Sequence, residues 1–158
     1  MNTGKPEQNQ AHHAEPRARE SAARQPRVII FTCNWNAYNS LQEAAKERLH
    51  LPPEARTLKV DCLGSLSSSL VLKAFEKGAD GVVLVGCSPE ECHYEFGSRR
   101  AAELFEEVGR LYALLGFDQD RLRFYQVHAG EGSHLVELMQ AFVEQLQALV
   151  GHAAEEEG

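Results

Sequence analysis

The sequence lacks the glycine-rich segments that bind nucleotide phosphates, since neither G-x-G-x-x-G nor a P-loop pattern occurs in its 158 residues. Nucleotide binding therefore has no direct support. The sequence also lacks an apolar run near the ~20 residues that span a bilayer. Its N-terminus is polar and has no apolar core of the kind found in secretory signals. We therefore expect a cytoplasmic protein without a membrane span.

Positive charge is in deficit, with 16 Lys and Arg against 23 Asp and Glu, which gives a net charge of -7. Such a balance argues against a nucleic-acid partner, because nucleic-acid binders usually present a basic face. Cysteine is also scarce, with four in the chain. Thiols stay reduced in the cytoplasm. We therefore interpret the four cysteines as ligands or redox groups rather than as disulfides.

Large apolar residues are almost absent from residues 1–26, which are rich in Gln, Glu, Ala and Arg. Such a segment cannot offset the entropy cost of becoming ordered, and we predict a disordered tail there. Residues 151–158 are predicted to form a frayed acidic end. The part between them, residues 27–150, is long enough for one domain with its own hydrophobic core.

Strand and helix patterns alternate through residues 27–150. The clearest strand is the apolar run 81–86, Gly-Val-Val-Leu-Val-Gly, which suits a central parallel strand buried on both faces. Ser40 and Glu43 match a capping box at the start of a helix, and Gly78 and Gly116 match helix C-caps. The predicted strands are 27–33, 57–62, 81–86 and 122–127, and the predicted helices are 40–49, 67–77, 98–115 and 133–150. This βαβαβαβα order predicts an α/β fold: a single domain with a four-stranded parallel sheet, helices on both faces and flavodoxin-like winding.

The cysteines follow the strands. Cys33 ends the first predicted strand, Cys62 ends the second, Cys87 follows the third, and Cys92 lies in the same loop as Cys87. The carboxyl ends of parallel strands share one edge of a sheet, and neighbouring strands lie ~4.8 Å apart. Three βα loops are therefore expected to bring all four thiols to one site. A set of four cysteines suits an iron–sulfur cluster or a structural zinc ion.

The segment after Cys87 is predicted to begin a short helical turn, with Ser88 as its cap and Pro89 in the first position. Its amide groups would point toward the thiolates and stabilise their charge. His93 and His128 lie at the same edge, where either could be a ligand, although a histidine bound to loop backbone is the commoner case. Trp35 and Tyr94 flank the cysteines and could shield a bound group or contact a partner.

Several interpretations of the cysteines stay open on these residues alone. They could be small buried apolar residues, although four at strand ends is unusual for that role. They could hold zinc in a protein-interaction module without a redox role. They could belong to a thiol–disulfide oxidoreductase, but the usual C-x-x-C is broken because Asn36 stands in its fourth position.

At these residues the sequence resembles the delta subunit of methyl-viologen-reducing hydrogenase, an iron–sulfur family found with heterodisulfide reductases. The resemblance extends from about Val28 to Val150. It is carried by residues 31–35 (FTCNW), 60–64 (VDCLG), 77–82 (KGADGV) and 86–94 (GCSPEECHY), with Gly97 and residues 131–132 after them.

The resemblance implies a 2Fe–2S cluster as cofactor, with Cys33, Cys62, Cys87 and Cys92 as the ligands that this chain offers. It implies a non-catalytic electron-transfer subunit of an oxidoreductase complex. The electron donor would be a hydrogenase or formate dehydrogenase-type subunit, and the acceptor a flavin-containing subunit like heterodisulfide reductase. No nucleic-acid partner is expected.

The chain departs from the family pattern at three positions. The family usually has a further cysteine where this chain has Asn36, often has His in place of Ser88, and has Arg in place of Ser65. Four thiols remain, which is the number that a Cys₄ cluster needs. The changes at Ser65 and Ser88 indicate an altered partner surface or reduction potential.

Overall fold

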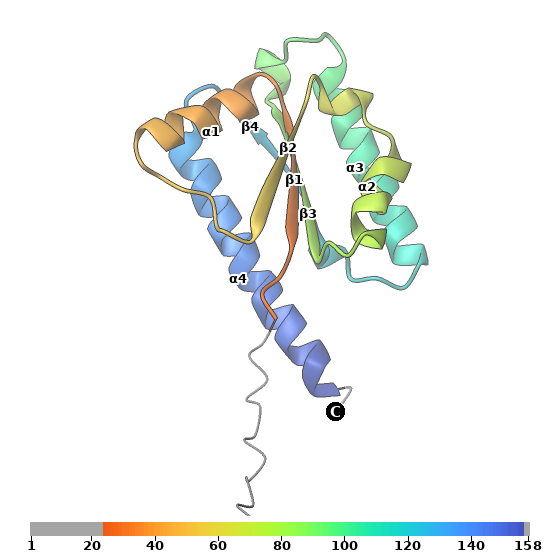
Figure 1. The fold of residues 1–158 in the computed structure, drawn as a ribbon. Coiled ribbons are helices and arrows are strands. Elements are labelled where there is room, and N and C mark those ends of the chain that lie inside the picture. The colour runs from red at the N-terminus through yellow and green to blue at the C-terminus, as the bar shows by residue number, and fades with distance from the viewer. Residues whose placement is uncertain (1–23, 157–158) are drawn as a thin grey trace, which may run out of the picture.

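The computed structural model of the chain describes residues 24–156 (Figure 1). Its strands and helices alternate as the sequence predicts. They are β1 (Val28–Cys33), α1 (Asn36–Lys46), β2 (Ala55–Val60), α2 (Ser68–Glu76), β3 (Gly81–Cys87), α3 (Gly97–Leu114), β4 (Leu122–Val127) and α4 (Gly132–Glu156). Three short 3₁₀ turns connect them: η1 (Leu63–Ser65), η2 (Pro89–Glu91) and η3 (Gln119–Arg121).

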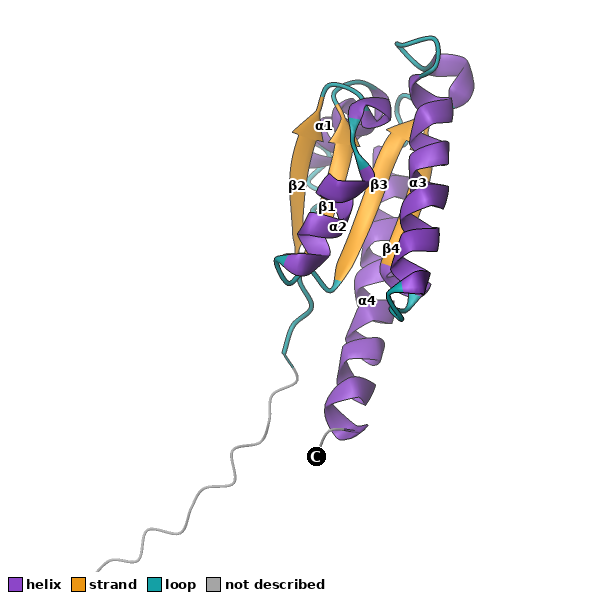
Figure 2. Ribbon diagram, turned by 90° about the vertical axis from the view of Figure 1, so that its right-hand side faces the viewer, coloured by secondary structure: helices purple, strands orange, loops and turns teal. Residues whose placement is uncertain are grey.

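The four strands form one parallel sheet in the order β2-β1-β3-β4. Helices α1 and α4 cover one face, and α2 and α3 cover the other (Figures 1 and 2). The α/β fold with a four-stranded parallel sheet and flavodoxin-like winding is therefore confirmed. No helix within residues 24–156 combines the length and the apolar character that crossing a membrane requires.

The core lies along β3 and the inner side of α4. Every residue of β3 is buried, because the strand has neighbours on both sides and helices over both faces. On α4 an apolar stripe packs on the sheet, with Leu135, Met139, Phe142 and Leu146 buried. Apolar burial of this kind is the main source of stability for such a domain.

Helix α1 begins at Asn36, four residues before the predicted start, and the capping box predicted at Ser40 is wrong. The chain turns into the helix directly after β1, with Trp35 at the N-cap and no side-chain capping bond. Ser40 is buried inside the helix, where its hydroxyl donates to the carbonyl oxygen of His128 at 3.3 Å. The amino end of α1 therefore lies beside Cys33.

Strand β2 covers residues 55–60 rather than 57–62, so the prediction that Cys62 ends this strand is wrong. The register pairs Val28 with Ala55 and Cys33 with Val60, and the pairing stops where β1 turns into its loop. Cys62 lies two residues beyond the strand, immediately before η1.

The chain ends differ in part from the predicted boundaries. Residues 1–23 of the predicted disordered tail lie outside the described residues, whereas Arg24 and Pro26 are placed and Pro26 is buried. Both guanidinium nitrogens at the tip of Arg24 donate to the Asp80 carboxylate, at 2.9 and 2.7 Å. Helix α4 continues to Glu156, past the predicted helix end at Val150.

Candidate functional site

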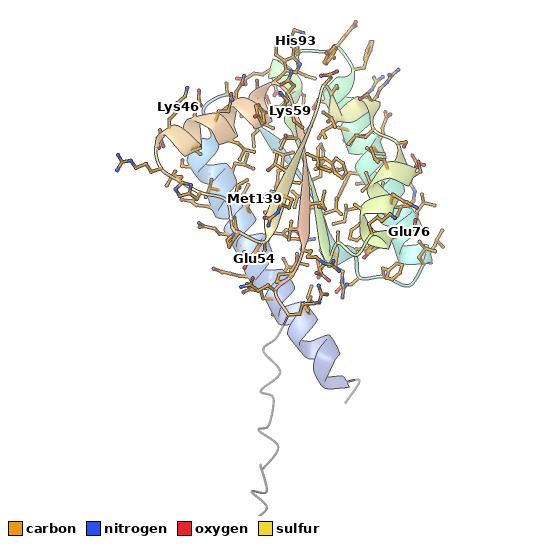
Figure 3. All side chains as sticks on the ribbon, in the orientation of Figure 1. Lys46, Glu54, Lys59, Glu76, His93 and Met139 are labelled. Atoms are coloured by element: carbon orange, nitrogen blue, oxygen red, sulfur yellow. The ribbon has the colours of Figure 1, made fainter. Side chains whose placement is uncertain are left out.

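The four cysteines come together in one narrow cavity at the carboxyl edge of the sheet. Cys33 is the last residue of β1, Cys62 precedes η1, Cys87 is the last residue of β3, and Cys92 follows η2. All four line the same cavity, together with Trp35, Asp61, His93, Tyr94 and Gly97. Figure 3 places His93 at this edge, at the top of the view. The four thiols therefore converge from three βα loops, as the sequence predicts.

The thiols are arranged as two pairs. The Sγ atoms of Cys33 and Cys87 lie 3.2 Å apart, and both side chains are buried. Cys62 and Cys92 both lie against Gly97 and are partly exposed. The site thus has an inner pair on the two central strands and an outer pair on the loops.

Gly97 makes room for the outer pair. A Cβ atom at this position would lie 2.6 Å from the Cys62 Sγ and 3.2 Å from the Cys92 Sγ, which is closer than sulfur and carbon can pack. Gly97 is also the first residue of α3. The sequence placed a helix boundary near this glycine, but nothing in the sequence alone ties it to the two sulfurs.

Backbone amide groups at the amino end of α1 favour negative charge on Cys33. The pKa of Cys33 is lowered to about 6, chiefly by a hydrogen bond from the Cys87 thiol, against the opposing effect of burial, and the backbone N–H groups of Ala37 and Trp35 contribute to this lowering. The same hydrogen bond and burial raise the pKa of Cys87. These amides belong to the amino end of α1, which therefore supplies the stabilisation that we expected from the turn after Cys87.

The turn after Cys87 forms at η2, with Pro89 in its first position and Ser88 before it. The Ser88 side chain makes no capping bond, and its hydroxyl is buried with no hydrogen-bond partner among the described residues. Thus the predicted turn is confirmed, but the predicted capping role of the Ser88 side chain is wrong.

Aromatic side chains close one wall of the cavity. The indole ring of Trp35 stacks on the His93 ring, with centroids 3.5 Å apart and an angle of 15° between the planes. Tyr94 meets His93 in an edge-on arrangement, with ring centroids 5.0 Å apart. The Trp35 Nε1 is buried and has no hydrogen-bond partner among the described residues. Trp35 and Tyr94 therefore flank the cysteines as the sequence predicts.

Glu91 joins three loops of this edge, a role that sequence reasoning missed. Its Oε2 accepts from the Asn36 side-chain amide at 2.6 Å and from the backbone N–H of Ala129 at 2.9 Å. Its Oε1 lies 3.4 Å from His128 Nδ1. The hydrogen bond from Ala129 is the main cause that lowers the pKa of Glu91. No local pattern could reveal this role, because Asn36 and Ala129 are 55 and 38 residues away in the chain.

Asn36 and His128 both face Glu91 rather than the thiol cavity. Neither is among the residues that line the cavity, whereas His93 is. The family pattern usually has a further cysteine at the position of Asn36. In this chain, the Asn36 side chain instead connects two loops through its hydrogen bond to Glu91. His128 makes its contact at the outer side of the same network.

The donor set suits a sulfur-ligated group. Within residues 24–156, no three His, Cys, Asp or Glu side chains are arranged around a single metal ion. Two cysteine pairs in one cavity match the requirement of a dinuclear cluster, in which each iron takes two protein ligands. The cavity between the cysteines is narrow, with a volume of about 10 Å³. The two cysteine pairs would therefore have to move apart to hold such a group between them.

Comparisons with known proteins agree with this arrangement. The family model of the methyl-viologen-reducing hydrogenase delta subunit matches residues 28–150. The iron-sulfur subunit of the F420-non-reducing hydrogenase vhc of Methanococcus voltae is 33% identical over 129 residues, which are 79% of this chain and 87% of that protein. The iron-sulfur subunit of the F420-non-reducing hydrogenase of Archaeoglobus profundus is 30% identical over 118 residues, 75% of this chain and 86% of that protein.

A second kind of relative is much longer. A subunit of the ferredoxin:CoB-CoM heterodisulfide reductase of Methanosarcina mazei is 32% identical over 124 residues, which are 78% of this chain but 16% of that protein. The same domain is therefore one part of a larger chain in that relative. The family match covers the whole sheet and all four cysteines that meet at its carboxyl edge. This chain belongs to the methyl-viologen-reducing hydrogenase delta subunit family.

Proposed function

We propose that this protein is an electron-transfer subunit that carries a 2Fe–2S cluster on Cys33, Cys62, Cys87 and Cys92. The observation that carries the proposal is the meeting of four thiols, delivered by three βα loops, in one cavity. The names of the relatives add support, because the two hydrogenase proteins are called iron-sulfur subunits. A bound 2Fe–2S cluster would take up and return one electron at a time.

The two cysteine pairs differ in a way that suits this role. The inner pair is 3% and 5% exposed, so Cys33 and Cys87 would hold one side of the group away from water. Cys62 and Cys92 are partly exposed and would present the other side to a partner. Burial on one side and access on the other is what an electron relay needs, since the reduction potential depends on solvent exposure and the transfer depends on proximity.

The expected partners are a hydrogenase subunit on one side and a flavin-containing, heterodisulfide-reductase-like subunit on the other. The heterodisulfide reductase relative from Methanosarcina mazei contains this domain within its own chain, which supports the second partner. The names of the hydrogenase relatives support the first. Formate dehydrogenase as donor and a cytoplasmic location stay predictions.

Anaerobic purification with metal and sulfide analysis tests the cofactor. We expect about two iron and two sulfide per chain, absorption in the visible range, and a paramagnetic resonance signal on one-electron reduction. A colourless protein with one zinc ion and no sulfide would instead indicate the zinc-stabilised interaction module.

Replacement of single cysteines tests the ligand set. Cys62→Ala is expected to lose most of the iron and of the visible absorption, because each thiolate supplies a bond that the other three cannot replace. Full iron and an unchanged resonance signal in Cys62→Ala would show that the ligand set is wrong.

A second candidate function, thiol–disulfide exchange, is favoured by one observation. The Sγ atoms of Cys33 and Cys87 are 3.2 Å apart, close enough for oxidation to link them after a small movement. The burial of both sulfurs argues against it, since exchange requires that an incoming thiolate reach one of them. Alkylation of the metal-free protein tests this candidate. Labelling of the Cys33 thiol within seconds, with loss of this fast phase in Cys33→Ala, would favour thiol–disulfide exchange over the relay.

A further inference from the structure

The indole N–H of Trp35 is a buried hydrogen-bond donor without an acceptor. Three buried side-chain polar atoms among the described residues have no partner: Thr32 Oγ1, Trp35 Nε1 and Ser88 Oγ. Trp35 is the one of these three residues that lines the thiol cavity. An indole nitrogen can only donate, so it needs an acceptor to offset the cost of leaving water.

The position of the indole is fixed by its surroundings. The ring is stacked on His93 at 3.5 Å, and His93 directly follows Cys92. Trp35 is also the N-cap residue of α1, two residues after Cys33 in the chain. The ring is therefore held between the loops that carry a cysteine of each pair.

Apart from one hydroxyl, the buried side-chain acceptors that line this cavity are sulfur atoms. That hydroxyl belongs to Ser98 and is already engaged, since it donates to the Cys87 carbonyl oxygen at 2.9 Å and accepts from Gln126 at 2.7 Å. The other polar side chains of the lining, Asp61, His93 and Tyr94, are exposed. The cysteine sulfurs, and any sulfide held between them, are therefore the buried side-chain acceptors that remain for the N–H.

We propose that the Trp35 indole N–H donates a hydrogen bond to a sulfur of the bound cluster and thereby raises its reduction potential. This inference rests on the proposed function. Reduction adds negative charge to the sulfur-ligated group, and a hydrogen bond to sulfur stabilises the more negative form. Trp35 acts in this scheme as a positioning and tuning residue, because it supplies neither a ligand nor an electron.

The variant Trp35→Phe tests the proposal, because it keeps an aromatic ring for the stack on His93 and removes the N–H. In the anaerobically reconstituted full chain, iron and sulfide content should stay unchanged. The midpoint potential should move to a more negative value, by about 59 mV if the equilibrium constant for one-electron reduction falls tenfold. Equal potentials for the two proteins, with equal iron content, would overturn the inference.

Thr32→Val is the matched control. The Thr32 hydroxyl is also buried and without a partner among the described residues, yet Thr32 is not one of the residues that line the cavity. Its removal should leave the midpoint potential unchanged. A shift in Thr32→Val as large as that in Trp35→Phe would show that loss of any buried donor near the loops has this effect, and would contradict a specific role for Trp35.

A measurement on the unmutated protein covers the case in which Trp35→Phe fails to fold. The chain contains a single Trp, so selective labelling with ¹⁵N-indole tryptophan reports on Trp35 alone. In the reduced protein, pulsed paramagnetic resonance should detect a ¹⁵N coupling, and the iron–sulfur stretching bands should shift in D₂O. Absence of both effects in a protein with full iron and sulfide overturns the inference alone, whereas absence of iron and sulfide overturns the proposed function itself.

Discussion

Gly97 occupies a position where even a methyl group would collide with two sulfur atoms. Gly97→Ala would place a Cβ 2.6 Å from the Cys62 Sγ. We expect this variant to lose most of its bound iron, because the outer pair of thiols would be pushed apart, while the sheet remains folded. Iron analysis and far-ultraviolet circular dichroism check the two parts of this prediction.

Gly109 provides the control within the same helix. A Cβ at Gly109 would meet nothing within 4 Å. Gly109→Ala should keep its iron and should stabilise α3 by about 0.5–1 kcal/mol, because glycine is a poor residue for a helix interior. Full iron content in Gly97→Ala would contradict the steric role that we assign to Gly97.

Asp80 links the start of the described chain to the sheet. Burial raises its pKa, but hydrogen bonds from the Arg24 guanidinium and the Arg27 backbone N–H outweigh that effect, so that the pKa is lowered overall. Its stabilising contribution is therefore complete above the unfolded value of about 4 and is lost as the pH falls through the lower folded value. We expect Asp80→Asn to reduce the free energy of unfolding by about 1–2 kcal/mol at pH 7.

Denaturant titrations at several pH values check this prediction. The difference between Asp80→Asn and the unchanged protein should be constant from pH 6 to pH 8 and should shrink as the pH falls below about 4. If the difference in the free energy of unfolding stayed the same at low pH, the charge of Asp80 would contribute nothing to stability. Asp118, an exposed residue, supplies a control through Asp118→Asn.

At the scale of elements, the sequence predicted the regular interior better than the boundaries. The apolar run of β3 was predicted because a strand that is buried on both faces is apolar along its whole length. The start of α1 was missed because Asn36 follows β1 after a two-residue turn, without the side-chain cap that marks most helix starts. The bounds of β2 were missed because they depend on where its partner β1 ends, which the sequence of β2 alone does not show.

The candidate site was likewise predictable in part. The meeting of Cys33, Cys62, Cys87 and Cys92 was predictable, because parallel topology brings the carboxyl ends of strands together. The division of the thiols into two pairs and the role of Glu91 were not predictable, since both depend on contacts between residues far apart in the chain.

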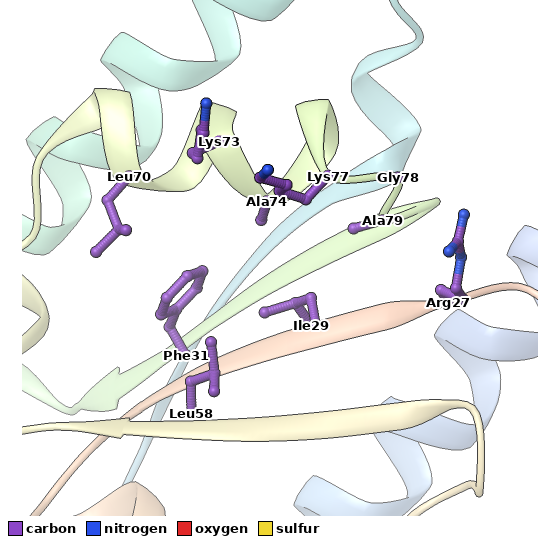
Figure 4. A pocket seen from close by; sticks show the side chains of 10 residues that line it. All are labelled: Arg27, Ile29, Phe31, Leu58, Leu70, Lys73, Ala74, Lys77, Gly78 and Ala79. Carbon is purple, nitrogen blue, oxygen red and sulfur yellow. The ribbon is translucent and has the colours of Figure 1, made fainter.

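Helix α2 covers its part of the sheet incompletely, which leaves an apolar cavity of about 310 Å³ beside β1 and β2. Ile29, Phe31 and Leu58 form the sheet side, and Ala74 lies on the helix side (Figure 4). Ala74→Leu should fill part of this space and stabilise the domain by about 0.5–2 kcal/mol. Chemical denaturation checks the prediction.

The control for this change is Ala113→Leu, at an exposed position of α3. Leucine and alanine are both good helix formers, so this variant should change the free energy of unfolding by less than about 0.5 kcal/mol. Equal effects of Ala74→Leu and Ala113→Leu on the free energy of unfolding would show that filling the cavity beside β2 does not stabilise the domain.

Across the whole molecule, exposed apolar side chains gather at both ends of α3. At the cysteine edge Tyr94 and Phe96 are 43% and 45% exposed, and at the other end Leu114 and Phe117 are 84% and 52% exposed. Figure 2 shows α3 running the length of the sheet between these ends. Exposed aromatic residues are enriched in interface cores, so we expect the proposed redox partner to dock on Tyr94 and Phe96, beside the thiols.

We therefore expect Phe96→Asp to weaken binding of a heterodisulfide-reductase-like partner at least tenfold while the visible spectrum of the protein stays unchanged. Phe117→Asp makes the same chemical change at the other end and should have little effect on that binding. Titration calorimetry with the purified partner measures both. Unchanged affinity in Phe96→Asp would place the docking surface elsewhere.

The place of the cysteines at one edge of the apolar core bears on the order in which such a protein is assembled. The buried apolar residues of β3 and α4 form most of that core from the chain alone. In small zinc domains, by contrast, metal binding supplies the free energy of folding itself. With the proposed function, the chain would finish folding first and receive iron afterwards, past the partly exposed Cys62 and Cys92 to the buried Cys33 and Cys87. Loss of the metal under oxidative stress would then leave a folded scaffold ready to be refilled, and any gain in stability on refilling would follow mass action.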